Sequence, residues 1–105
     1  MSGVTCCDFD VFVKAMADET RQRILVLLRN REMSVNELTE HCALTQPTIS
    51  HHLARLRRAN LVTAHHDGRQ TFYRAIPACV AECCQEILLR FNPSVVEKIK
   101  AGGKP

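Results

Sequence analysis

The sequence predicts a small, mostly α-helical domain that carries one β-hairpin. The chain has 105 residues, which is enough for one hydrophobic core but not for two. Apolar residues recur at helical spacing through most of its first half. The pattern then changes to two short β-prone runs on either side of Asp67-Gly68, a dipeptide that favours tight hairpin turns. A further helical run follows, so we expect about five to six helices and a single pair of strands.

The first two helices are predicted from apolar spacing and from one capping residue. Phe9 and Met16 bound a short amphipathic run that indicates the first helix. Asp18 is suited to cap the second helix, because its side chain can accept from free backbone N–H groups there. Residues 24–28 are strongly apolar, so we place the second helix at the centre of the core.

Two further helices are predicted with only a brief turn between them. Ser34 and Glu37 have the spacing of a capping box at the start of the third helix. Thr45 can cap the fourth helix, and Pro47 falls in its first turn, where a missing N–H does no harm. Asn60 tolerates the left-handed conformation that ends many helices.

The rest of the chain predicts the hairpin and a fifth helix. Residues 61–66 and 70–75 are the expected strands. Pro77 opens a helical run that continues to about Phe91, and Asn92-Pro93 breaks it. A last short helical turn over 95–100 precedes a terminal segment that we expect to be loose.

We divide the chain into an N-terminal arm (1–8), a domain (9–91) and a C-terminal extension (92–105) that is partly loose. No apolar run approaches the roughly 20 residues that a membrane helix needs, and the first residues show no secretory signal pattern. We therefore expect a cytoplasmic protein without a membrane partner. In that compartment the six cysteines are expected to be free thiols rather than a disulfide framework.

The third and fourth helices, joined by a tight turn, are typical of a helix-turn-helix motif, and the hairpin is suited to be its wing. The second helix of such a motif enters the major groove, where Gln, Ser, Thr, His and Arg can read base edges. The residues predicted to contact double-stranded DNA are Thr45, Gln46, Thr48, Ser50, His51, Arg55 and Arg69. Thr45 and Arg69 are expected on the phosphate backbone.

These motifs resemble the ArsR/SmtB family of repressors. The run LTQPTISHHL over 44–53 looks like the family's recognition helix, and ADETR over 17–21 resembles the segment before its core helix. Asp67-Gly68-Arg69, followed by Tyr73-Arg74, looks like the family's wing. The resemblance spans about residues 9–91. It implies a winged-helix homodimer, joined through its first and fifth helices, that represses a promoter and leaves its operator when it binds a metal ion, a metalloid or another small signal.

Two sensor sites familiar in that family are missing. The first is a Cys-Val-Cys pattern in the third helix, and here Ser34 and Asn36 stand where the thiols would be. The second uses Asp, His and Glu on the fifth helix. By alignment, the corresponding positions hold Pro77, Cys79, Arg90 and Pro93. The sensor site must therefore be argued from this chain's own cysteines.

The candidate ligands are cysteines of the fifth helix and of the arm. Cys79 and Cys83 are four residues apart on a helix, so their thiolates can point at a common atom. Cys84 is turned toward a neighbouring apolar stripe, where packing is its expected role, although it remains a further candidate. Cys6 and Cys7 can complete the site, and in a dimer the arm of one subunit can lie over the fifth helix of the other.

A set of three sulfurs favours As(III) as the regulatory ligand, with Cd(II), Pb(II) or Zn(II) as alternatives. No permanent cofactor is expected. Thiols at such a site also suit a sensor of oxidants or reactive sulfur. A winged-helix interaction module without a sensor is a further alternative. An enzyme is not expected, because the chain has no phosphate loop, no nucleophile elbow and no evident acid–base pair.

Overall fold

The computed structural model describes residues 6–91. The elements in chain order are α1 (Phe9–Met16), α2 (Glu19–Leu27), β1 (Met33–Ser34), α3 (Val35–Cys42), α4 (Gln46–Arg58), β2 (Val62–Asp67), β3 (Gln70–Ala75) and α5 (Pro77–Phe91). This arrangement confirms the mostly helical winged helix-turn-helix fold. Residues 1–5 and the whole predicted extension over 92–105, with its short sixth helix, lie outside the described residues.

The predicted caps are present at the helix ends. Ser34 and Glu37 form the full capping box at the start of α3, and Asp18 and Thr45 accept from backbone N–H groups at the starts of α2 and α4. Asn60 adopts a φ of 60°, the left-handed conformation expected just after α4. Local hydrogen bonding therefore sets where the helices of the motif begin and end.

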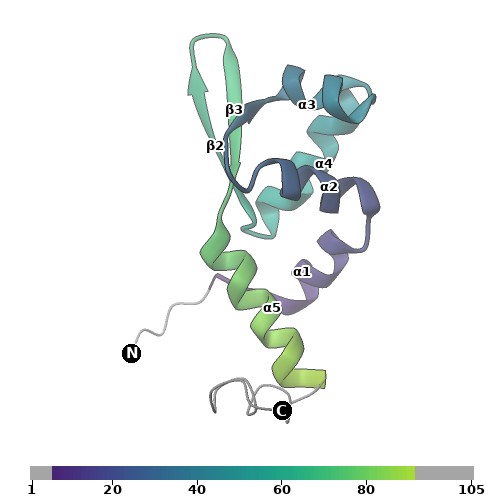
Figure 1. Cartoon of the computed structure of the whole chain (residues 1–105), viewed down its shortest axis with the longest axis vertical. Coiled ribbons are helices and arrows are strands. Elements are labelled where there is room, and N and C mark those ends of the chain that lie inside the picture. Colours follow the sequence, from purple (N-terminus) through teal and green to yellow (C-terminus); the bar gives the residue numbers. More distant parts are fainter. Residues whose placement is uncertain (1–5, 92–105) are drawn as a thin grey trace.

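The sheet has three antiparallel strands in the order β1-β3-β2, one more than predicted. The β2–β3 hairpin turns at Asp67-Gly68, where Gly68 has a φ of +66°, and projects beyond the helices as the wing (Figure 1). The additional strand β1 is two residues long and pairs with β3. This pairing joins the segment before α3 to the base of the wing.

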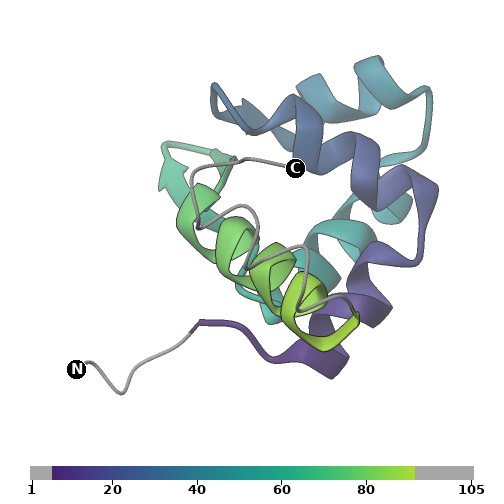
Figure 2. The same ribbon diagram turned by 60° about the horizontal axis from the view of Figure 1, so that its bottom comes forward.

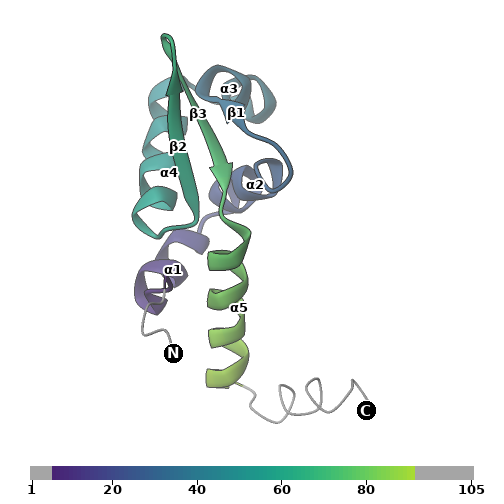
Figure 3. The same cartoon turned by 90° about the vertical axis from the view of Figure 1, so that its left-hand side faces the viewer.

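The core lies between α2, α3, α4 and the base of the sheet. Its fully buried side chains include Ile24, Leu28, Met33, Leu38, Ile49, Leu53, Leu56 and Leu61. Cys42 is also buried there, and burial raises the pKa of its thiol. α5 extends away from this core and lies beside α1 (Figures 2 and 3). Within residues 6–91, no helix combines the length and the apolar character needed to cross a membrane.

The guanidinium of Arg21 is buried where α1, α2 and α4 meet. Its Nε donates to the carbonyl oxygen of Ala15 at 2.6 Å, and its Nη2 donates to that of Lys14 at 3.1 Å. Its Nη1 lies 3.2 Å from Nδ1 of His52 on α4. One side chain of α2 thus satisfies carbonyl groups at the end of α1 and holds that end against α4.

We predict that Arg21→Met lowers the free energy of unfolding by about 2–3 kcal/mol, because the buried carbonyl group of Ala15 loses the hydrogen bond from Arg21 and that of Lys14 keeps only its bond from the N–H of Ala17. Urea denaturation followed by circular dichroism measures the change. Arg23→Met is the matched control, since Arg23 lies on the exposed side of the same helix and its loss should cost less than about 0.5 kcal/mol. Equal losses in the two variants would contradict the assigned role of Arg21.

Candidate functional site

The exposed face of α4 carries the side chains predicted to contact DNA. Its inner face is fully buried through Ile49, Leu53 and Leu56. All of the predicted contact residues are exposed: Thr45, Gln46, Thr48, Ser50, His51 and Arg55 at α4, and Arg69 at the wing turn. α4 therefore presents a polar and basic surface of the type that enters a major groove. The individual base and phosphate contacts remain predictions.

Hydrogen bonds hold several of these side chains in place before any ligand is present. The Oγ1 atoms of Thr45 and Thr48 lie 2.9 Å apart. Nε of Arg55 donates to Nε2 of His51 at 3.3 Å, so this imidazole nitrogen is an acceptor there. Such ordering reduces the side-chain entropy that is lost on binding.

His52 is the neighbour of the exposed His51 but faces the other way, between Arg21 and Asp18. Nδ1 of His52 lies 4.0 Å from Oδ1 of Asp18. Desolvation lowers the pKa of His52, and the nearby Asp18 carboxylate only partly opposes this effect. The imidazole is therefore neutral at pH 7 and can accept the hydrogen bond from Arg21.

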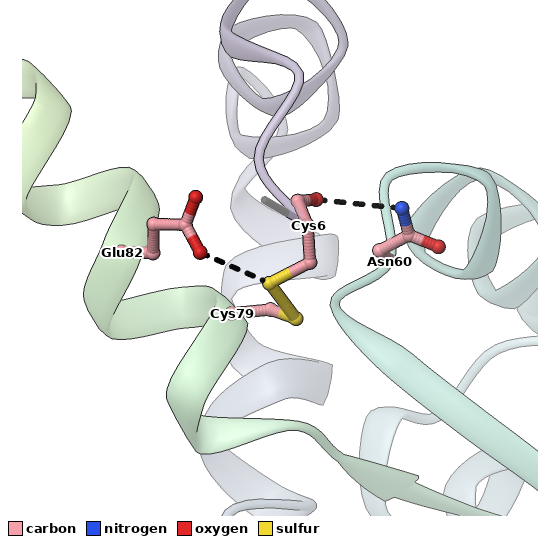
Figure 4. Close-up of a disulfide and its surroundings, with 4 residues drawn as sticks. All are labelled: Cys6, Asn60, Cys79 and Glu82. Carbon is pink, nitrogen blue, oxygen red and sulfur yellow. Dashed lines mark hydrogen bonds between the residues drawn. A yellow bond between two sulfur atoms is a disulfide. The ribbon is translucent and has the colours of Figure 1, made fainter. Parts of the chain in front are cut away.

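The arm and α5 are joined by a disulfide bond between Cys6 and Cys79, whose Cα atoms are 5.6 Å apart (Figure 4). Nδ2 of Asn60 donates to the carbonyl oxygen of Cys6 at 3.3 Å. The Cys6 Sγ also lies 3.4 Å from Oε1 of Glu82. A disulfide sulfur has no proton to donate, so this contact becomes a hydrogen bond only when Cys6 is a free thiol.

A second pair of cysteines lies beside the Cys6–Cys79 disulfide. The side chain of Cys7 is hydrogen-bonded to that of Cys83, which is completely buried. Burial, followed by this hydrogen bond, raises the pKa of Cys83 to about 12. Cys6, Cys7, Cys79 and Cys83 thus form one group, which we call the thiol cluster. Among residues 6–91, no three Cys, His, Asp or Glu side chains are arranged around a common metal position, and two of these four sulfurs are bonded to each other.

Two sequence-based expectations about these cysteines need correction. Cys84 is exposed rather than packed, because α5 turns Cys79 and Cys83 toward its own chain and leaves the next position outside. Cys6 and Cys79 are joined in a disulfide bond, so these two are not the free thiols that were expected. Within this chain the arm lies over α5, because α1 and α5 are neighbours and the arm leads directly into α1. The contacts of Asn60 and Glu82 with Cys6 depend on this tertiary arrangement, and no local pattern indicates them.

Comparisons with known proteins agree with the fold and the motif. Residues 18–64 match the family described as bacterial regulatory protein, arsR family. KmtR of Mycobacterium tuberculosis is 48% identical over 69 residues, which are 66% of this chain and 52% of KmtR, so the match spans about half of that relative. The arsenical resistance operon repressor of Staphylococcus aureus is 32% identical over 99 residues, 90% of this chain and 94% of the repressor.

A solved structure of similar fold is reduced HlyU from Vibrio cholerae. It aligns with a TM-score of 0.63 at 38% identity and covers 79% of this chain and 86% of its own. HlyU of Vibrio cholerae is itself named a transcriptional activator. These relatives are transcriptional regulators rather than enzymes, in agreement with the prediction from the sequence.

We predict that the stability of the protein falls as the pH drops through the ordinary histidine pKa of about 6.5, and that His52→Gln reduces this fall. The folded state holds His52 at a lowered pKa, so the unfolded chain takes up the proton first and is favoured by acid. Urea denaturation at about pH 7.5 and about pH 5.5 measures the difference. His41→Gln, on the exposed side of α3, should leave the pH dependence unchanged. An equal effect of both variants would contradict the role of His52.

Proposed function

Because the chain belongs to the arsR family of bacterial regulatory proteins, we propose that it is a homodimeric repressor that leaves its operator when As(III) binds the thiol cluster. The main support for this proposal is the contact between the arm and α5, which places Cys6 against Cys79 and Cys7 against Cys83.

The donor set suits a thiophilic ion. Two sulfurs close enough to form a disulfide are also close enough, once reduced, to bind one ion together. As(III) prefers three sulfur ligands, and Cys7 is adjacent to Cys6 in the arm. We therefore assign Cys6, Cys7 and Cys79 as the ligands, with the buried Cys83 behind them. Soft sulfur donors favour As(III), Cd(II) or Pb(II) over Mg²⁺ or Ca²⁺.

The route from the thiol cluster to the DNA-binding face passes through α1. Asp8, one residue beyond Cys7, caps α1 by accepting from the N–H of Val11 at 3.3 Å. At its other end α1 is held by Arg21, which also contacts His52 on α4. A ligand that repositions the arm thus acts on the orientation of α4, and couplings of this kind are typically about 1–3 kcal/mol.

The proposed dimer uses the outer sides of α1 and α5. Exposed apolar side chains lie on both helices: Val13 on α1, and Leu88, Leu89 and Phe91 on α5. Phe91 is 75% exposed, which is unusual for an aromatic side chain at a helix surface without a partner. A second copy of the chain would remove this apolar surface from water.

Titration of arsenite against the protein–operator complex tests the proposal, with the operator obtained by in vitro selection. A phosphine keeps the thiols reduced, because thiol reductants would bind arsenite themselves. We predict that arsenite releases the wild type, and that Cys6→Ser or Cys79→Ser abolishes release without weakening DNA binding. Cys84→Ser is the matched control and should still respond. If the Cys79→Ser variant leaves the operator at the arsenite concentration that releases the wild type, the assigned site is wrong.

A second candidate function is a response to oxidants or reactive sulfur, and the Cys6–Cys79 disulfide is the observation that favours it. Formation of this bond removes two electrons and two protons from the thiols, which a peroxide or a polysulfide accepts. Release by peroxide or polysulfide in the absence of arsenite, reversed by the phosphine, would assign the protein to this class.

The same titration with Cd(II), Pb(II) and Zn(II) compares the alternative ions. A protein that no ligand releases would be a winged-helix module without a sensor.

For base recognition, we predict that Gln46→Ala reduces affinity for the selected operator by about 1–3 kcal/mol while random-sequence duplex is bound as before, because base-edge contacts carry the specificity. Fluorescence anisotropy with both duplexes provides the comparison. Gln85→Ala removes an exposed amide from α5 and is the control. A loss of equal size on random-sequence DNA would show that Gln46 acts on the backbone instead.

A further inference from the structure

A groove between α1 and α4 lies beside the face predicted to contact bases. Its volume is about 260 Å³, and it is lined by Val11, Lys14 and Ala15 from α1 and by Arg55 and Arg58 from α4. Of these residues only Arg55 is among the DNA contacts predicted from the sequence, and α1 lies outside the helix-turn-helix. The groove therefore brings a cation from a distant part of the chain next to two cations of α4.

The charge of this groove is unbalanced. No carboxylate lines it, and none of the ion pairs among residues 6–91 involves Lys14, Arg55 or Arg58. All three residues are exposed, so their charged groups can reach a ligand from solvent. Three cations around a concave surface create a positive potential that attracts anions.

The position of the groove identifies the anion. Arg55 belongs to both surfaces, because its Nε donates to His51 on the exposed face of α4 while its side chain also lines the groove. The groove is thus continuous with the DNA-binding face. A DNA strand that passes this face carries a phosphate at every nucleotide, and Lys and Arg are its usual partners.

We propose that the groove binds a backbone phosphate of double-stranded DNA through Lys14 and Arg58, with Arg55 as the shared cation. This inference rests on the proposed DNA-binding function. It extends the DNA contact surface from α4 and the wing to α1. It also changes the role of Arg55 from reading a base to holding the backbone. Because α1 follows the arm, one of the DNA contacts then lies on the helix that the thiol cluster anchors.

Affinity for random-sequence duplex and for the selected operator, measured over a range of salt concentrations, tests the proposal. Each lost phosphate contact lowers the salt slope by about 0.9, equivalent to about a five-fold loss of affinity at about 0.15 M salt. Lys14→Gln and Arg58→Gln should each show this change on both duplexes. Arg57→Gln, an exposed neighbour that does not line the groove, is the matched control for charge and should show a smaller change.

The outcomes separate this inference from the proposed function. If the wild type shows no salt-dependent DNA binding, the proposed function itself fails. If the wild type binds DNA but Lys14→Gln and Arg58→Gln keep its salt slope, or lose no more than Arg57→Gln does, the groove is not a phosphate site. Saturable binding of inorganic phosphate together with unchanged DNA affinity would assign the groove to a free anion and overturn the proposal. Thermal unfolding of each variant verifies that the fold is retained.

Discussion

The buried guanidinium of Arg21 is the interaction on which the arrangement of the helices depends. α1 is a short helix of eight residues at the edge of the core, and its last turn would otherwise leave carbonyl groups without partners. Arg21 donates to the carbonyl of Ala15, shares that of Lys14 with the N–H of Ala17, and reaches His52 on α4 with its remaining nitrogen. The position of α1 relative to the DNA-binding helix is therefore set by hydrogen bonds of defined direction, and not only by apolar contact.

Most of the fold could be predicted from the sequence because its boundaries are set by local chemistry. The capping box of Ser34 and Glu37 and the Asp67-Gly68 turn each involve residues close in the chain, and all of them are formed as predicted. The strand β1 could not be predicted, because two residues carry no periodic signal and its partner strand lies far along the chain. The burial of Arg21 could not be predicted from the sequence either, since a guanidinium in an amphipathic helix usually faces solvent.

The thiol cluster shows where prediction from helical phase reaches its limit. The four-residue spacing of Cys79 and Cys83 shows that they share a side of α5, and this holds in the structure. It does not show which side packs against the chain, so the full burial of Cys83 and the exposure of Cys84 could not be predicted. That choice is made by the arm, whose Cys6 is fixed by Asn60 and Cys79. Contacts between segments at opposite ends of the domain decide the chemistry of this site.

The Cys6–Cys79 bond also changes the topology of the chain. With a sequence separation of 73, it closes a covalent ring that contains α1, the recognition helix and the entire wing, while most of α5 remains outside. A ring of this size removes about 4 kcal/mol of conformational entropy from the unfolded chain. Oxidation therefore makes the DNA-binding part harder to unfold, whereas reduction opens the ring and exposes the same sequence to proteases more often. The redox state of two sulfurs thereby changes how readily the folded domain opens.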